Sequence, residues 1–152
     1  MSESGQQADT AAAAQTPASP QRNCFVIDDD AGICKALSFT LRRLGFATSE
    51  IATPDGLEAA IETQVPDLIF LDLGLGQAGA MDILPILSQH GYEGPIQLMS
   101  GRSQAVLDEI VAVGEEFGLT MLPALEKPFR MGVVKELVAG LGFAAPEGAP
   151  AA

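Results

Sequence analysis

Basic residues are scarce in this chain. It has 8 Lys and Arg against 20 Asp and Glu, which gives a formal net charge of -12 at pH 7. A protein that neutralises phosphate groups needs clustered positive charge, and no basic patch stands out along the sequence. The charge balance therefore argues against direct contact with nucleic acid or with an anionic membrane surface.

Long apolar runs and a leader pattern are missing too. No hydrophobic stretch approaches the roughly 20 residues that a membrane-spanning helix needs. The amino terminus has no basic region followed by an apolar stretch, so no secretory signal is indicated. The chain has 2 cysteines, Cys24 and Cys34, without metal or redox spacing. We expect a cytoplasmic protein whose reduced thiols serve in packing.

Large hydrophobic residues are nearly absent from both ends of the chain. Residues 1–21 are mostly Ala, Gln, Ser, Thr and Pro, and residues 144–152 have a similar composition. Such segments cannot offset the entropy lost on ordering. The composition predicts two disordered tails around one domain at residues 22–143.

Between these tails, short apolar runs alternate with helical patterns. The predicted strands are 24–27, 46–51, 67–72, 95–99 and 120–125. The predicted helices are 30–44, 53–61, 80–89, 106–117 and 133–141. Alternating strands and helices predict a parallel sheet covered on both faces. With right-handed crossovers, the expected fold is α/β, a flavodoxin-like (βα)5 doubly wound sheet of strand order 2-1-3-4-5.

Local signals mark several helix ends. Asp30 has the position of an N-cap for the first helix, and Thr53 followed by Pro54 has the same pattern for the second. Gly45 is expected to end the first helix. Pro85 lies inside the third predicted helix, which predicts either a kink or a late start.

The strand at 67–72 ends on a carboxylate, Asp72. In the expected strand order it lies beside the loop that follows the first strand, which reads Asp28-Asp29-Asp30. Two carboxylates about 4 Å apart repel by about 4 kcal/mol at an effective dielectric constant of 20. A hard cation resolves this repulsion, and Mg²⁺ suits an open set of oxygen ligands. We expect Asp29 and Asp72 as direct ligands, Asp28 through water, and the Gly74 backbone carbonyl.

Two more strand ends carry polar groups. Ser100 follows the fourth strand, and Lys127 follows the fifth and precedes a proline. Taken singly, such residues are more often a cap and a surface charge. Together with a metal and a carboxylate at one sheet edge, they are the groups that stabilise the oxygens of a phosphoryl group in transfer.

Residues 23–143 resemble the receiver domain of two-component response regulators, in its stand-alone, chemotaxis-like form. The matching motifs, in chain order, are Asp28-Asp29, Asp72, Ser100-Gly101 and Lys127-Pro128-Phe129. The resemblance implies Mg²⁺-dependent transfer of a phosphoryl group from the phosphohistidine of a sensor histidine kinase to Asp72. It also implies a cis bond before Pro128.

The same resemblance implies roles for the remaining site residues and for the output. Asp28 and Asp29 would hold the metal, while Ser100 and Lys127 would bind the phosphoryl oxygens. We expect no effector domain after the last helix, and therefore output through a protein target or a histidine phosphotransfer protein, with no nucleic-acid or membrane partner. A homodimer through the face of helix 106–117, strand 120–125 and helix 133–141 is left open. The chain would be no enzyme beyond its own phosphorylation and dephosphorylation.

Three alternatives stay beside this hypothesis. A receiver-like binding module that works without phosphorylation is compatible with Gly76 and Ala124, which replace a proline and a switching aromatic of the common pattern. A flavin- or nucleotide-binding enzyme would need a Ser/Thr/Gly-rich loop where the three aspartates stand. An aspartyl phosphohydrolase would need an acid at Gly74. The last two rank low.

Overall fold

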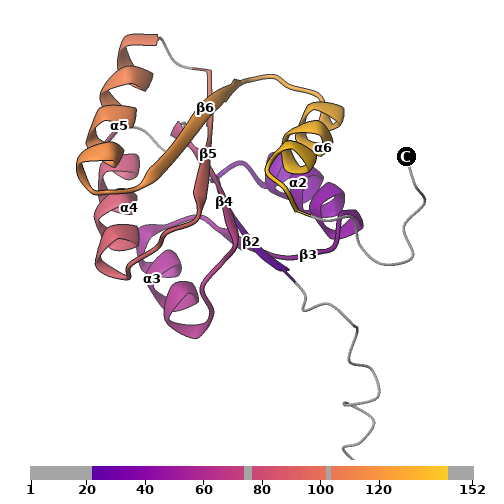
Figure 1. Cartoon of the computed structure of the whole chain (residues 1–152), viewed down its shortest axis with the longest axis horizontal. Coiled ribbons are helices and arrows are strands. Elements are labelled where there is room, and N and C mark those ends of the chain that lie inside the picture. Colours follow the sequence, from indigo (N-terminus) through magenta and orange to yellow (C-terminus); the bar gives the residue numbers. More distant parts are fainter. Residues whose placement is uncertain (1–21, 74–76, 102–103, 144–152) are drawn as a thin grey trace, which may run out of the picture.

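Five strands form a central sheet with helices on both faces (Figure 1). The computed structural model describes residues 22–73, 77–101 and 104–143. The strands are β2 (Arg22–Ile27), β3 (Phe46–Ile51), β4 (Leu68–Asp72), β5 (Pro95–Ser100) and β6 (Thr120–Glu126). The helices are α2 (Ala31–Arg43), α3 (Pro54–Thr63), α4 (Gln77–Gln89), α5 (Gln104–Glu116) and α6 (Met131–Gly140). The predicted tails, Gly74 and Gly76 lie outside the described residues.

The strand order confirms the predicted topology. All neighbouring strands pair in parallel in the order β3-β2-β4-β5-β6, which is 2-1-3-4-5 in chain order. Ile27 pairs with Leu71, and Asp72 pairs with Met99. Because the strands are parallel and in this register, the residues that follow β2, β4 and β5 reach the same edge of the sheet.

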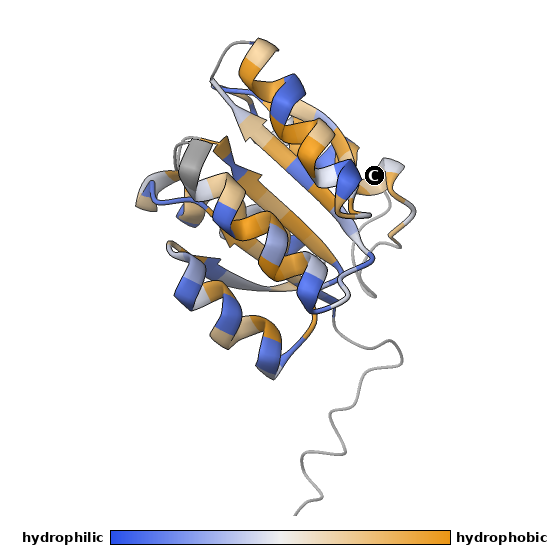
Figure 2. Ribbon diagram, turned by 90° about the vertical axis from the view of Figure 1, so that its left-hand side faces the viewer, coloured by the Kyte–Doolittle hydropathy of each residue, from blue (hydrophilic) through white to orange (hydrophobic). Residues whose placement is uncertain are grey.

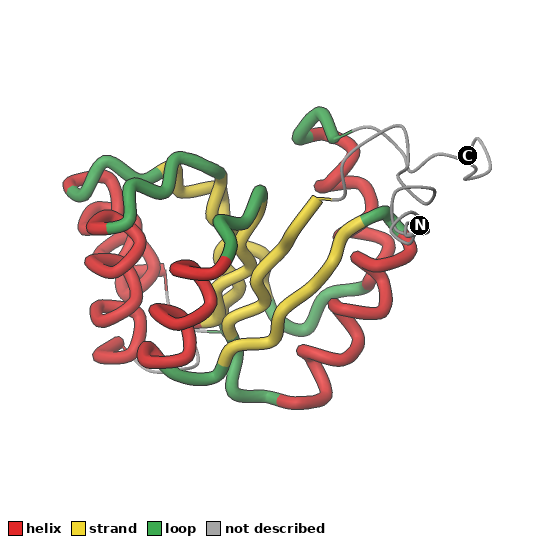
Figure 3. Tube along the Cα trace, turned by 90° about the horizontal axis from the view of Figure 1, so that it is seen from below, coloured by secondary structure: helices red, strands yellow, loops and turns green. Residues whose placement is uncertain are grey.

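Strand β4 is buried along its whole length and contributes to two hydrophobic cores. Ile69 and Leu71 pack toward α3, α4 and α5, while Leu68 and Phe70 pack toward α2 and α6. Successive side chains of a strand point to opposite faces, which explains this division. Figure 3 shows the sheet between its two helical layers, and Figure 2 shows apolar central strands behind helices of mixed character. The continuous apolar run thus serves both cores.

The helix ends follow the predicted local chemistry. Asp30 Oδ1 accepts hydrogen bonds from the backbone N–H groups of Gly32 (2.9 Å) and Ile33 (3.1 Å). Thr53 Oγ1 accepts one from Gly56 N at 3.0 Å. Gly45 follows α2 with φ of 97°, a conformation that glycine adopts without steric cost. These caps satisfy donors and end the helices where the sequence indicated.

Helix α4 differs from its prediction at the first turn. It begins at Gln77 instead of Ala80, and Pro85 lies inside it, so the predicted late start is wrong. Proline removes one backbone donor from a helix interior. Ile83, Leu84 and Leu87 are fully buried, and this burial holds the helix through the proline. Within the described ranges, none of the helices combines the length and apolar character that a membrane span requires.

Candidate functional site

The loop after β2 holds three consecutive aspartates in different roles. Asp28 is 2% exposed, and its Oδ1 accepts a hydrogen bond from Asp30 N at 2.9 Å. Its backbone is fixed as well, because Asp28 N donates to Ile51 O (3.1 Å) and Cys34 Sγ donates to Asp28 O (3.2 Å). Asp29 is exposed between Asp28 and the capping residue Asp30. Capping accounts for Asp30 and leaves the other two carboxylates available for chemistry.

Asp72 ends the buried strand β4 and is itself 2% exposed. Its Oδ1 lies 2.8 Å from Lys127 Nζ as an ion pair. Apart from this charged contact, no hydrogen-bond donor among the described residues serves the buried Oδ1. A buried carboxylate oxygen with unused acceptor capacity is costly unless another donor or a cation serves it.

Lys127 joins the two buried carboxylates. Its Nζ donates a hydrogen bond to Asp28 Oδ2 at 3.1 Å while it contacts Asp72 Oδ1. Its backbone N–H donates to Ser100 O at 2.9 Å, which ties the end of β6 to the end of β5. The Lys127–Pro128 bond is cis, as the resemblance implied. The ammonium is thus held between side chains that lie 99 and 55 positions away in the sequence.

The charges of this cluster shift two pKa values. Burial raises the pKa of Asp28, and the Asp72 charge adds to this, while the Asp30 N–H and Lys127 oppose it. Burial tends to lower the pKa of Lys127, but the contacts with Asp72 and Asp28 outweigh it and the net shift is upward. Lys127 therefore remains a cation at neutral pH.

Ser100 lies at the end of β5 and is 4% exposed. Its backbone pairs with Glu126 in the sheet, and its carbonyl receives the Lys127 N–H. This places the Ser100 residue at the same edge as Asp72 and Lys127. Its predicted contact with phosphoryl oxygens stays a prediction.

The aspartates fit a divalent cation. Carboxylate oxygens of Asp28, Asp29 and Asp72 all lie within 4.8 Å of one another. Two of these carboxylates, Asp28 and Asp72, share the one ammonium of Lys127, and Asp29 adds a third carboxylate to the cluster. An all-oxygen set with excess negative charge suits Mg²⁺. The fourth predicted ligand, the Gly74 carbonyl, lies outside the described residues.

An apolar pocket beside this cluster was missed by the sequence reasoning. It has a volume of about 410 Å³ and lies between the first turns of α2 and the residues that follow Lys127. Its lining residues are Gly32, Ile33, Ala36, Lys127, Pro128, Phe129 and Met131. A large apolar residue directly after Lys127-Pro128 was the available signal, but its partners on α2 come from a distant segment.

Comparison with known proteins identifies the family. Residues 24–139 match the family model of the response regulator receiver domain. The chain belongs to this family. Receiver domains are the part of two-component response regulators that interacts with histidine kinases, and they generally use Mg²⁺ at an acidic pocket. This receiver domain has an acidic cluster of Asp28, Asp29 and Asp72.

The curated relatives of this chain include a DNA-binding response regulator and a transcriptional regulatory protein. This chain is 33% identical over 121 residues to the DNA-binding response regulator MtrA of Mycobacterium tuberculosis, and the match covers 78% of this chain and 48% of that protein. It is 31% identical over 131 residues to the alkaline phosphatase synthesis transcriptional regulatory protein SphR of Synechococcus elongatus, covering 80% and 48%. The chain thus spans about half the length of these relatives.

Solved structures share the receiver fold. The chemotaxis response regulator CheY4 of Vibrio cholerae superposes with a TM-score of 0.66 at 17% identity, covering 80% of this chain and 99% of that one. A response regulator receiver protein from Burkholderia phymatum superposes with a TM-score of 0.63 at 24% identity, covering 83% and 99%. At these identities the likeness concerns the fold, and it confirms the flavodoxin-like sheet.

Proposed function

We propose that this receiver domain accepts a phosphoryl group on Asp72 from the phosphohistidine of a sensor histidine kinase. A carboxylate oxygen of Asp72 attacks phosphorus, and the phosphorus–nitrogen bond breaks. The imidazole keeps the bonding electron pair and takes up a proton. The observation that carries the proposal is the position of Lys127 Nζ, 2.8 Å from Asp72 and 3.1 Å from Asp28 at a sheet edge.

The residues divide the work by charge. Lys127 faces the acceptor carboxylate. Its ammonium would stabilise the negative charge that develops on a phosphoryl oxygen during the transfer. Ser100, at the end of the neighbouring strand, offers a hydroxyl to a second oxygen. Asp28, Asp29 and Asp72 would hold Mg²⁺, which supplies positive charge that offsets the repulsion between carboxylate and phosphoryl group. The chain would then catalyse only its own phosphorylation and dephosphorylation.

The test uses a small-molecule phosphodonor in the presence and absence of Mg²⁺. Intact-protein mass spectrometry should show a gain of one phosphoryl group with Mg²⁺ and none after chelation. Asp72→Asn should show no gain, because an amide is not a comparable nucleophile. Asp67→Asn is a matched control, since Asp67 is exposed at the opposite end of β4. A gain in Asp72→Asn equal to that of the unaltered chain would refute the assignment of the acceptor.

A binding module that works without phosphorylation is the second candidate. It is favoured by Ala124, a small, partly buried residue of β6 that has no ring to rotate on phosphorylation. Binding of a target that is equally tight before and after treatment with the phosphodonor would support it. A change in affinity that Asp72→Asn abolishes would support the phosphorylated form.

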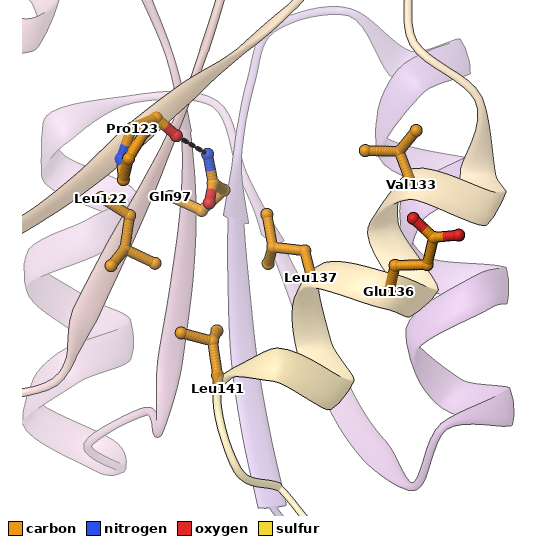
Figure 4. A pocket seen from close by; sticks show the side chains of 7 residues that line it. All are labelled: Gln97, Leu122, Pro123, Val133, Glu136, Leu137 and Leu141. Carbon is orange, nitrogen blue, oxygen red and sulfur yellow. Dashed lines mark hydrogen bonds between the residues drawn. The ribbon is translucent and has the colours of Figure 1, made fainter.

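Output is proposed to use the edge of the sheet beside α6. An open apolar pocket of about 410 Å³ lies between β6 and α6 (Figure 4). Its apolar lining consists of Leu122, Pro123, Val133, Leu137 and Leu141. Gln97 is buried at its floor and donates from Nε2 to Pro123 O at 2.7 Å. The site can take a protein target, a histidine phosphotransfer protein or a second receiver chain.

The remaining predictions on partners and location stay open to test. The two curated relatives include DNA-binding and transcriptional regulators, and this chain spans about half their length. The expected lack of a nucleic-acid partner therefore stays a prediction, supported by the net charge of -12. The cytoplasmic location and the absence of a membrane partner are proposed on the same sequence arguments as before.

A further inference from the structure

A second cluster of metal-binding side chains lies between α3 and α4. Glu58, Glu62 and His90 each offer a ligand atom, and these atoms lie within 4.8 Å of one another. His90 is the single histidine of the chain. The two helices pack against each other (Figure 1), and both run back from the edge of the sheet that carries Asp72. The cluster therefore lies near the opposite edge and shares no residue with the phosphoryl site.

The backbone on both sides of the cluster is well fixed. His90 N donates to Ile86 O at 3.1 Å, so the last turn of α4 continues through the histidine. Gly91, with φ of 70°, closes the helix, and Tyr92 N donates to Leu87 O at 3.0 Å. On α3, Glu58 and Glu62 are one turn apart on the same face. Their neighbours Leu57 and Ile61 are buried in the core.

The electrostatic surroundings favour a cation. Glu62 lies in the last turn of α3, and His90 directly follows α4, so the negative ends of two helix dipoles are close by. Neither helix has a basic residue in its last turn. Two glutamates at positions i and i+4 repel each other. No Lys or Arg within the described ranges forms an ion pair with Glu58 or Glu62.

The contact between the histidine and the first glutamate has the wrong length for a hydrogen bond. His90 Nε2 and Glu58 Oε2 are 3.7 Å apart. Two ligand atoms bound tetrahedrally at about 2.0 to 2.1 Å from one Zn²⁺ ion are about 3.3 Å apart. The exposed glutamate side chains can close this small difference by rotation. The observed spacing is longer than a hydrogen bond, and it fits an ion pair with a protonated imidazole or a metal ion bound between the groups.

We propose that Glu58, Glu62 and His90 form a Zn²⁺ site, with water as the remaining ligand. One imidazole nitrogen and two carboxylates form a mixed set of the kind that binds Zn²⁺. The all-oxygen cluster of Asp28, Asp29 and Asp72 has the different preference for Mg²⁺. The bound ion joins α3 to α4, and it offsets the repulsion between Glu58 and Glu62, for which the described residues supply no Lys or Arg partner.

The experiment is isothermal titration of the full chain with Zn²⁺ in excess Mg²⁺, which keeps the aspartate cluster occupied. We expect one Zn²⁺ per chain, and a Co²⁺-substituted sample should show the absorption bands of a nitrogen- and oxygen-ligated ion. His90→Gln and Glu62→Gln should lose this binding. Glu116→Gln, an exposed acid of α5, is the charge-matched control and should retain it, as should Asp29→Asn.

Three results would overturn the proposal. The first is absence of Zn²⁺ binding by the unaltered chain, and the second is unchanged binding by His90→Gln. The third is loss of binding in Asp29→Asn, which would place the ion in the aspartate cluster. Circular dichroism of each variant shows whether it is folded. Because Glu62 is exposed and His90 is only partly buried, we expect folded variants. Failure of Asp72 phosphorylation would leave these results unaffected.

Discussion

Removal of the Lys127 ammonium tests the charge balance of the site most directly. In Lys127→Ala, the buried carboxylates of Asp28 and Asp72 lose their shared cation. Their oxygens lie within 4.8 Å of each other, which corresponds to a repulsion of about 3 to 4 kcal/mol at an effective dielectric constant of 20. Loss of one partner from a buried ion pair typically costs about 3 to 5 kcal/mol. We therefore expect the free energy of unfolding to fall by about 3 kcal/mol without Mg²⁺.

The sign of the pH dependence follows from Asp28. Its pKa in the folded state is already raised by burial, and loss of Lys127 raises it further. A carboxyl group with a raised folded pKa favours folding below its unfolded pKa, and this contribution is lost as pH rises through the folded pKa. The cost of Lys127→Ala should therefore be smaller at acid pH than at pH 8. Mg²⁺ should recover part of it at pH 8, because the ion replaces the missing positive charge.

Urea denaturation at acid pH and at pH 8, with and without Mg²⁺, measures these effects. Lys135→Ala is the matched control, since Lys135 is an exposed lysine of α6. Placed on an Asp72→Asn background, Lys127→Ala should cost less, because only one buried carboxylate then loses its partner. Equal losses at both pH values and no effect of Mg²⁺ would refute the electrostatic reasoning.

Three further predictions concern the frame of the site. Asp30→Ala removes the cap of α2 and should lower the free energy of unfolding, measured by urea denaturation, by about 1 kcal/mol. An unchanged free energy of unfolding would show that the hydrogen bonds of this cap contribute nothing to stability. Phe70→Ala opens a cavity at a fully buried position and should cost about 3 to 5 kcal/mol by the same assay, whereas Phe39→Ala, at a 62% exposed position, should cost far less. Burial raises the pKa of Cys34 to about 11, and it raises the pKa of Cys24 as well. We therefore expect iodoacetamide at pH 8 to modify neither thiol, as read by mass spectrometry, until the chain unfolds. Rapid modification of the folded chain would contradict this.

The site could be predicted in part because its residues follow strands that the sequence marks clearly. A run of four apolar residues before Asp72 indicates a buried strand, and the parallel topology then brings its end beside the loop at Asp28. The structure brings Asp28, Asp29, Asp72 and Lys127 together as expected. The start of α4 was placed wrongly because a helix end without a clear capping residue has no local signal.

The amino-acid sequence by itself determined the elements, their order and, where a capping residue or a glycine is present, their ends. Apolar periodicity and capping act between residues a few positions apart, so Asp30, Thr53 and Gly45 mark their helix ends without reference to the rest of the chain. Only the tertiary structure decided which distant side chains meet. The approach of His90 to Glu58, and of the Lys127 ammonium to both Asp28 and Asp72, depends on packing and register between separate elements, which no local interaction specifies.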